Sequence, residues 1–168
     1  MNSTTLFRAL RFIILLSFQI LVLNHVHLMS YITPLIIGYM VISLHRGTSR
    51  ISCILWGFSI GLIFDIFSDT AGMASAACTL VGLLQPVILG MFTPRDAAED
   101  FVPTVANMGF WNYTLYSFIL MIILHAVFYI LDAFTLSNII LTLSAIIGGT
   151  IFATILVLFC DLLVRARK

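Results

Sequence analysis

The sequence predicts an all-α polytopic membrane protein of about six membrane-spanning helices, with residues 1–168 forming a single transmembrane domain. The 168 residues are 61% hydrophobic and only 9% charged, whereas a soluble domain carries about 25% charged residues. The mean hydropathy is +1.15. Long apolar runs recur along the whole chain, and basic residues fall between alternate runs. Lipid is therefore the expected solvent for most of the surface.

A helix needs about 20 mostly apolar residues to cross the ~30 Å hydrocarbon core of a bilayer. The run that follows Arg8 and Arg11 is placed like a signal peptide, but no A-x-A-like cleavage site follows it, so we interpret it as a retained helix. The second run is short and has Pro34 near its start, which predicts a tilted, irregular or partly re-entrant segment. The six predicted spans cover residues 10–29, 32–45, 51–67, 72–92, 112–131 and 138–163.

The basic residues predict the orientation. Six spans that start from a cytoplasmic N-terminus leave all of them on the same side, and cytoplasmic loops are the ones enriched in Lys and Arg. They are Arg8, Arg11, Arg46, Arg50, Arg95, Arg165, Arg167 and Lys168. The opposite side carries Asp69 and Asp132, with Asp65 just inside that edge. We therefore expect both termini in the cytoplasm and only very short loops on the far side.

Small residues spaced by four predict close helix packing, because helices in lipid associate where backbones can approach. These residues are Gly57, Gly61, Gly72, Ala74, Ala76, Cys78, Gly82, Ala145, Gly149 and Ala153. They indicate that the spans over 51–67, 72–92 and 138–163 form the packed centre. The span over 112–131 has bulky residues on all sides and is expected to face lipid or a partner. The small-residue rows fit internal packing, and they also fit a groove for a partner.

Polar residues inside spans are costly and are candidates for function. Gln85 precedes Pro86, and its amide is expected to bond the carbonyl that the missing proline N–H leaves free one turn back. His125 is expected to make a hydrogen bond between helices rather than to bind a ligand. Asp161 lies four residues before Arg165, a spacing typical of an ordinary helical ion pair.

Asp65 and Asp69 lie at the junction of two apolar runs. The sequence Ser68-Asp69-Thr70 suits the start of the helix over 72–92, which predicts that Asp69 caps that helix. Asp65 then needs a partner, and no Lys or Arg is available on its side. The candidates are backbone N–H groups of the next helix, the hydroxyls of Ser68 or Ser75, His125, and a partner protein. Bracing of the hairpin and contact with a partner or ligand both stay open.

Several functions lack support in the sequence. The net charge is +1, without a basic patch of the kind that binds nucleic acid. Cys53, Cys78 and Cys160 are far apart and have no metal-site spacing. Motifs such as G-x-S-x-G or a phosphate loop are also missing. We therefore expect no catalytic residue, cofactor, metal or small-molecule ligand.

The order of residues around the two aspartates resembles the rod shape-determining MreD family. The pattern is Gly57-x-x-x-Gly61-Leu62-x-x-Asp65-Ile66-Phe67-Ser68-Asp69-Thr70-x-Gly72-Met73, supported by Gln19, Pro94-Arg95-Asp96 and residues His125 to Phe134. The resemblance implies a non-enzymatic subunit of the bacterial cell-elongation complex in the inner membrane. Such a subunit binds MreC and couples MreB filaments to wall synthesis by a glycosyltransferase and a transpeptidase.

The MreD family is similar in fold to the substrate-binding S-components of energy-coupling-factor transporters, which supplies an alternative. An S-component would bind a vitamin or metal at its outer face and would dock its coupling subunit through alanine-rich rows on the first helix. Residues 12–23 contain no such row, and the outer loops are short. The sequence therefore favours the scaffold over the transporter.

Overall fold

The computed structural model describes residues 17, 19, 35–94, 97–133 and 139–165, and the regular elements of these residues are all helices. The helices are α2 (Gly38–Ile42), α3 (Arg50–Ser68), α4 (Met73–Phe92), α5 (Val105–Met108), α6 (Phe110–Asp132) and α7 (Ile139–Arg165). The four longest, α3, α4, α6 and α7, are each long and apolar enough to cross a membrane. The prediction of an all-α membrane protein is confirmed, while the count of six spans and the side of the termini stay predictions.

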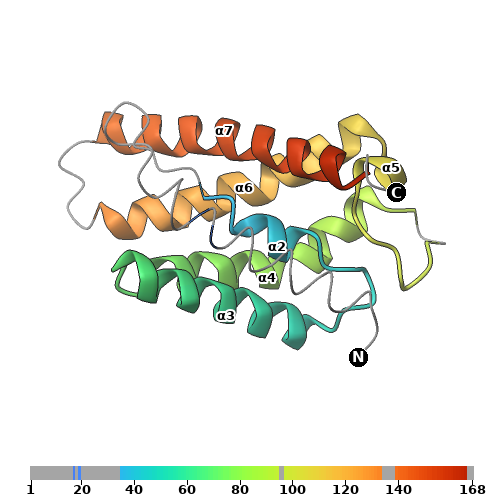
Figure 1. Cartoon of the computed structure of the whole chain (residues 1–168), viewed down its shortest axis with the longest axis horizontal. Coiled ribbons are helices and arrows are strands. Elements are labelled where there is room, and N and C mark those ends of the chain that lie inside the picture. Colours follow the sequence, from blue (N-terminus) through green and yellow to red (C-terminus); the bar gives the residue numbers. More distant parts are fainter. Residues whose placement is uncertain (1–16, 18, 20–34, 95–96, 134–138, 166–168) are drawn as a thin grey trace.

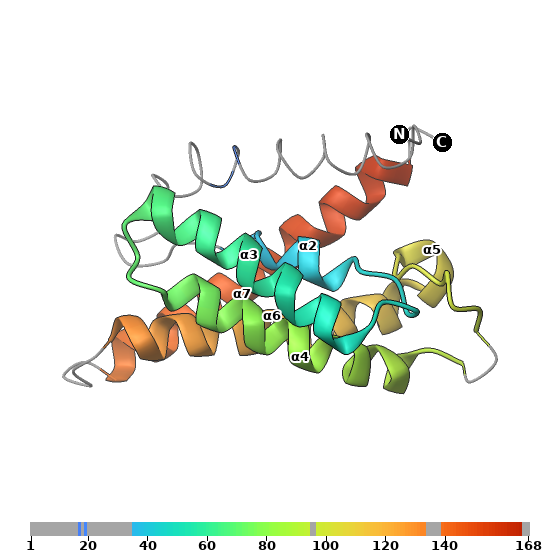
Figure 2. The ribbon, with the colours of Figure 1, turned by 90° about the horizontal axis from the view of Figure 1, so that it is seen from below.

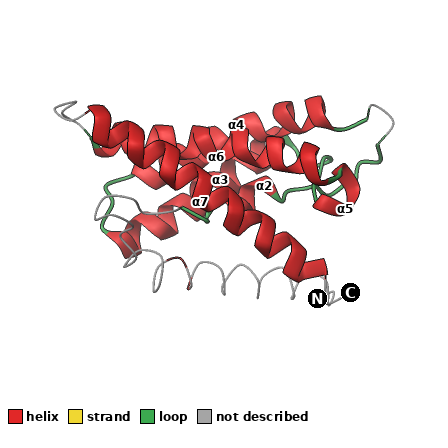
Figure 3. Ribbon diagram, turned by 90° about the horizontal axis from the view of Figure 1, so that it is seen from above, coloured by secondary structure: helices red, strands yellow, loops and turns green. Residues whose placement is uncertain are grey.

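The four long helices lie side by side in the order α3, α4, α6, α7, and successive ones run antiparallel (Figure 1). One end of the molecule therefore holds the first residue of α3, Arg50, together with the ends of α4 and α7 and the start of α6. We call this the Arg50 end. The opposite end holds the turn between α3 and α4 and is called the Asp69 end. Loops gather at these two ends (Figure 3).

The predicted span over 32–45 is not one continuous helix where it is described, in agreement with the expectation of an irregular segment. Its described part contains only the five-residue helix α2, which is about 7–8 Å long and too short to cross a bilayer. α2 contacts α3, α4 and α6 (Figure 2). The side chains of Leu35, Ile36, Val41 and Ile42 are almost completely buried. This run is apolar because protein surrounds it, a situation that hydropathy cannot distinguish from contact with lipid.

The prediction that the span over 112–131 lies outside the packed centre and faces lipid or a partner is wrong. α6 packs against both α4 and α7, and a larger share of it is buried than of the other long helices. Its bulky residues Leu120, Met121 and Leu124 are buried in the core, and Met121 and Leu124 lie against Gly38 of α2. Large side chains on a membrane helix thus serve here as core residues around a short neighbour.

The other predicted bounds agree with the structure to within about two residues, with α3, α4, α6 and α7 in place of 51–67, 72–92, 112–131 and 138–163. Apart from residues 17 and 19, the predicted span over 10–29 lies outside the described residues.

The connection between α4 and α6 is fastened to the chain just before α3. The Arg46 guanidinium donates to the carbonyls of Pro94 (3.0 Å) and Ala97 (2.9 Å). The backbone N–H groups of Arg46 and Gly47 donate to the carbonyls of Phe101 and Glu99. These bonds connect the two segments at the Arg50 end, and the short helix α5 lies within this connection.

Candidate functional site

Buried polar side chains gather around the short segment 35–44. A backbone segment that does not cross the membrane as one helix leaves N–H and C=O groups unpaired, and each must find a partner inside the protein. At the start of the segment, the Leu35 N–H donates to His125 Nε2 (3.2 Å) and the Ile36 N–H donates to Gln19 Oε1 (2.7 Å). Both of these side chains are fully buried.

Two other side chains bond the end of the same segment. The Tyr116 hydroxyl donates to the Ile42 carbonyl (2.9 Å), and Gln85 Nε2 donates to the Leu44 carbonyl (3.1 Å). Gln85 Nε2 also lies 3.1 Å from the Tyr116 hydroxyl oxygen, which accepts its second hydrogen. The segment is therefore anchored at both ends by Gln19, Gln85, Tyr116 and His125, which we call the four anchors.

The hydrogen bonds of His125 fix its chemical form. Because the Leu35 N–H is a donor, Nε2 is the acceptor, and the single ring hydrogen lies on Nδ1, 2.9 Å from the Met121 carbonyl. A Cβ atom at Gly149 would lie 2.6 Å from the His125 ring. Gly149 thus provides the space that the neutral ring occupies between α6 and α7.

The predicted role of Gln85 is wrong. Its side chain bonds Leu44, far away in sequence, instead of the turn of α4 that precedes Pro86. Pro86 lies inside α4, and the segment that ends at Leu44 has the greater need for a donor, since nothing continues its helix. His125 does make a bond to another segment, to the backbone of Leu35 rather than to a side chain of another helix.

The second polar centre lies in the hairpin of α3 and α4, where glycines let the two backbones meet. A Cβ atom at Gly61 would lie 2.6 Å from the Ser75 backbone nitrogen, and one at Gly57 would lie 2.9 Å from the Cys78 carbonyl carbon. Gly82 approaches the backbone of Cys53 equally closely. Larger residues at these positions would force the helices apart.

Asp65 lies one step of four beyond Gly61, and its buried carboxylate receives four hydrogen bonds. Oδ1 accepts from the Thr70 hydroxyl (2.6 Å) and the Ala74 N–H (2.9 Å). Oδ2 accepts from the Ser75 N–H (2.8 Å) and the Ser75 hydroxyl (2.7 Å). That hydroxyl also lies 3.0 Å from the Gly72 carbonyl, but it has one hydrogen, and the charged acceptor is the stronger one.

Asp65 therefore caps α4 from the neighbouring helix, and the prediction that Asp69 does so is wrong. The residue at the N-cap position is Gly72, which has no side chain to offer. The carboxylate of Asp65 occupies the place of a capping side chain and lies at the positive end of the α4 dipole. Asp69 instead ends α3 in the left-handed conformation, with φ 54°.

Asp161 belongs to the Arg50 end. It is buried, and its Oδ2 accepts from the Val105 N–H at the start of α5 (2.9 Å). The predicted pairing with Arg165 lies outside the described part of the chain, which does not include that side chain.

Two side chains of these polar centres were not indicated by the sequence. Tyr116 lies near the start of α6, and it is fully buried and bonds the Ile42 carbonyl of α2. Thr70 lies next to Asp69 in sequence, and only the fold of the turn brings it to Asp65. Within the described residues, His, Cys, Asp and Glu form no group of three that could hold a metal ion.

The fold and these contacts define a multi-pass membrane protein. It contains the short buried segment 35–44, which side chains hold at both ends, and a helical hairpin in which Asp65 caps α4. Comparison of the chain with family models, with characterised proteins and with solved structures gives no match.

Proposed function

We propose that the chain is a non-enzymatic, MreD-like subunit of the bacterial cell-elongation complex. In this role it binds MreC in the inner membrane and helps to couple MreB filaments to the wall-synthesising glycosyltransferase and transpeptidase. Both termini would lie in the cytoplasm.

The observation that carries the proposal is the agreement between the family-like pattern and one physical unit. The residues from Gly57 to Cys78, on which the resemblance depends most, form the α3–α4 hairpin. Gly57 and Gly61 allow the close approach, and Asp65 caps the next helix with four hydrogen bonds. The spacing of the pattern fits the geometry of this hairpin, and this agreement supports the proposal.

The use of the buried polar groups supports a scaffold over a transporter subunit. A substrate-binding protein directs polar side chains into a cavity. Here Gln85, Tyr116 and His125 are directed at the backbone of segment 35–44, and Asp65 at the backbone of α4. The buried polar side chains Asp65, Gln85, Tyr116 and His125 thus all have partners inside the protein.

The orientation of the proposal is supported by the charges at the two ends. Arg46 and Arg50 lie at the Arg50 end, and Asp69 and Asp132 lie at the other. An excess of basic residues is typical of the cytoplasmic side.

The test is co-expression of the tagged chain with MreC from the same bacterium, followed by purification in a mild detergent. We expect a stable complex, and we expect depletion of the chain to make rod-shaped cells round. A chain that purifies folded but without MreC, from cells that keep their shape, would overturn the proposal. Loss of uptake of one vitamin in those cells would establish the transporter alternative.

A further inference from the structure

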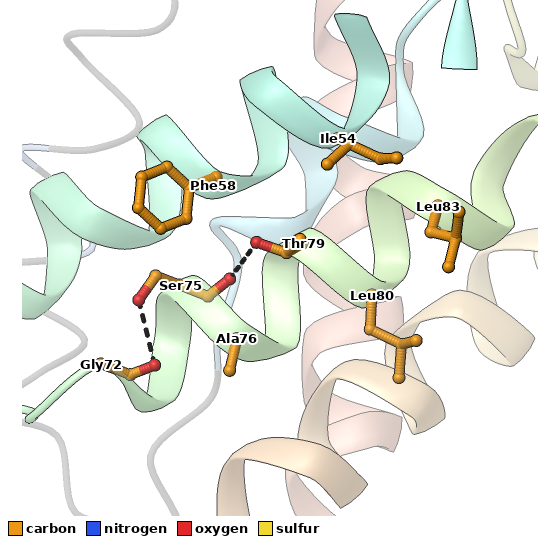
Figure 4. A pocket seen from close by; sticks show the side chains of 8 residues that line it. All are labelled: Ile54, Phe58, Gly72, Ser75, Ala76, Thr79, Leu80 and Leu83. Carbon is orange, nitrogen blue, oxygen red and sulfur yellow. Dashed lines mark hydrogen bonds between the residues drawn. The ribbon is translucent and has the colours of Figure 1, made fainter. Parts of the chain in front are cut away.

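An open groove runs along the exposed side of the α3–α4 hairpin (Figure 4). Its volume is about 510 Å³. Phe58 of α3 and Leu83 of α4 are among its walls, and both are nearly half exposed. Gly72 and Ala76 also line the groove and are exposed, so only small side chains cover the backbone along that part of α4.

The hydroxyl groups along the groove already have hydrogen-bond partners within the α3–α4 hairpin. The Thr79 hydroxyl donates to the Ser75 carbonyl (2.5 Å), and the Ser75 hydroxyl is held by Asp65. The groove therefore presents an apolar surface where another backbone can approach closely at Gly72 and Ala76. A second membrane helix with small residues on one face has the shape for such a surface, since helix contacts in lipid depend on close packing.

Asp69 lies in the turn that closes the Gly72 end of this groove. Its side chain is exposed, and among the described residues its carboxylate has no hydrogen-bond or ion-pair partner. The residue adopts the left-handed conformation at the C-terminal end of α3, where a negative charge is unfavourable to that helix dipole. A cation beside Asp69 would relieve this charge, and the described residues supply none at the Asp69 end.

We infer that the groove binds a membrane-spanning helix of MreC. This helix would have small residues facing Gly72 and Ala76, and an Arg or Lys near its end that pairs with Asp69. The apolar groove selects a helix, and the unpaired carboxylate selects a basic residue at one end of it. The inference depends on the proposed function, which names the partner, and adds the surface and the charge by which that partner is recognised.

The first experiment is photocrosslinking in the complete complex with p-benzoylphenylalanine in place of Leu83 in the groove. The control replaces Ile140 of α7, whose side chain is 83% exposed on a different helix. We expect a crosslink to MreC from position 83 and none from position 140. Equal crosslinks from both positions, a crosslink only to a second copy of the chain, or labelling of lipid alone would overturn the inference.

The second experiment compares two leucines on α4. Ala76→Leu fills the groove, whereas Gly90→Leu places the same side chain where a Cβ has open space around it. We expect Ala76→Leu to reduce MreC co-purification at least tenfold and Gly90→Leu to leave it unchanged, with both proteins eluting as folded monodisperse species. Should Ala76→Leu fail to fold, the crosslink at position 83 decides.

The third experiment tests the ion pair between Asp69 and MreC. We expect Asp69→Lys to abolish co-purification of MreC. An acidic residue in place of the basic residue of MreC that pairs with Asp69 should restore it. Retention of MreC by both Ala76→Leu and Asp69→Lys would overturn this inference and leave the proposed function intact. Failure of the unmodified chain to retain MreC would instead overturn the proposed function.

Discussion

Replacing Asp65 by asparagine preserves the size of the side chain but removes one acceptor oxygen. Each carboxylate oxygen of Asp65 accepts from one backbone N–H, that of Ala74 or that of Ser75. Whichever way the new amide is turned, its NH₂ group faces one of these two donors. A hydroxyl can rotate to another acceptor, but a backbone N–H at the start of a helix cannot, so one buried donor loses its partner.

The cost follows from this geometry. A buried donor without a partner costs about 1–3 kcal/mol, and hydrogen bonds to a charged group contribute about 1.5–3 kcal/mol each. Asp65→Asn should therefore lower the free energy of unfolding by about 3 kcal/mol. In a chain of this size, 1 kcal/mol corresponds to about 2–4 °C in Tm, so we expect a decrease of roughly 6–12 °C.

The cysteines provide the assay. Cys53 and Cys78 are almost completely buried, so a thiol-reactive fluorescent maleimide reports unfolding in detergent as these thiols become exposed. Asp69→Asn is the matched control, because it makes the same chemical change four residues away on an exposed residue. Asparagine tolerates the left-handed backbone conformation that Asp69 adopts. We expect its Tm to stay within about 2 °C of the unmodified protein, since exposed substitutions usually change stability by less than about 0.5 kcal/mol. Equal Tm values for the two variants would refute the assignment of Asp65 as the cap of α4.

Three further predictions use the same assay or a spectroscopic one. Gly61→Ala should lower the Tm, because the added methyl group meets the backbone of α4, while Gly90→Ala should leave it unchanged or raise it slightly, since its Cβ meets nothing within 4 Å; equal effects would contradict the close approach. Gln85→Leu and Tyr116→Phe should each destabilise, and the double variant should lose less than the sum, because the two side chains bond each other as well as segment 35–44; strict additivity would argue against the shared network. Nitrogen-15 NMR of labelled histidine should show His125 neutral with its hydrogen on Nδ1, and a signal from the Nε2-protonated form would contradict the bond to Leu35.

The sequence predicted the long helices well because length and apolar composition decide them. α3, α4, α6 and α7 each offer an apolar window of the length that a bilayer requires. The same criterion does not reveal that segment 35–44 is buried in protein, because hydropathy reports an apolar environment without saying whether protein or lipid provides it. The lipid-facing prediction for α6 failed for a related reason: its bulky side chains pack around α2, whose presence beside it no pattern in α6 indicates.

The polar residues were found one by one, but their common target was not. Gln85 and His125 stood out in the sequence because each interrupts an apolar run. Their partners are backbone groups of Leu44 and Leu35. Every residue has the same backbone groups, so the sequence does not indicate which of them need a side-chain partner. Tyr116 did not stand out, since a tyrosine does not interrupt an apolar run as sharply as a glutamine or a histidine. Residues that bond backbone across the fold are thus visible as anomalies before their role can be assigned.

The prediction that Asp69 caps α4 failed for a similar physical reason, whereas two of the partners expected for Asp65, the backbone N–H groups of the next helix and the Ser75 hydroxyl, are confirmed. Proximity in sequence favoured Asp69 as the cap of α4, but α3 continues to Ser68 and turns back within a few residues. The close approach at Gly61 brings the last turn of α3 against the first turn of α4, so the carboxylate one turn earlier reaches the free N–H groups. This geometry leaves Asp69 on the outside of the turn, exposed and without a described partner. Of the two acidic groups at this junction, the inner one is used for folding, and the outer one is the carboxylate that a partner can reach.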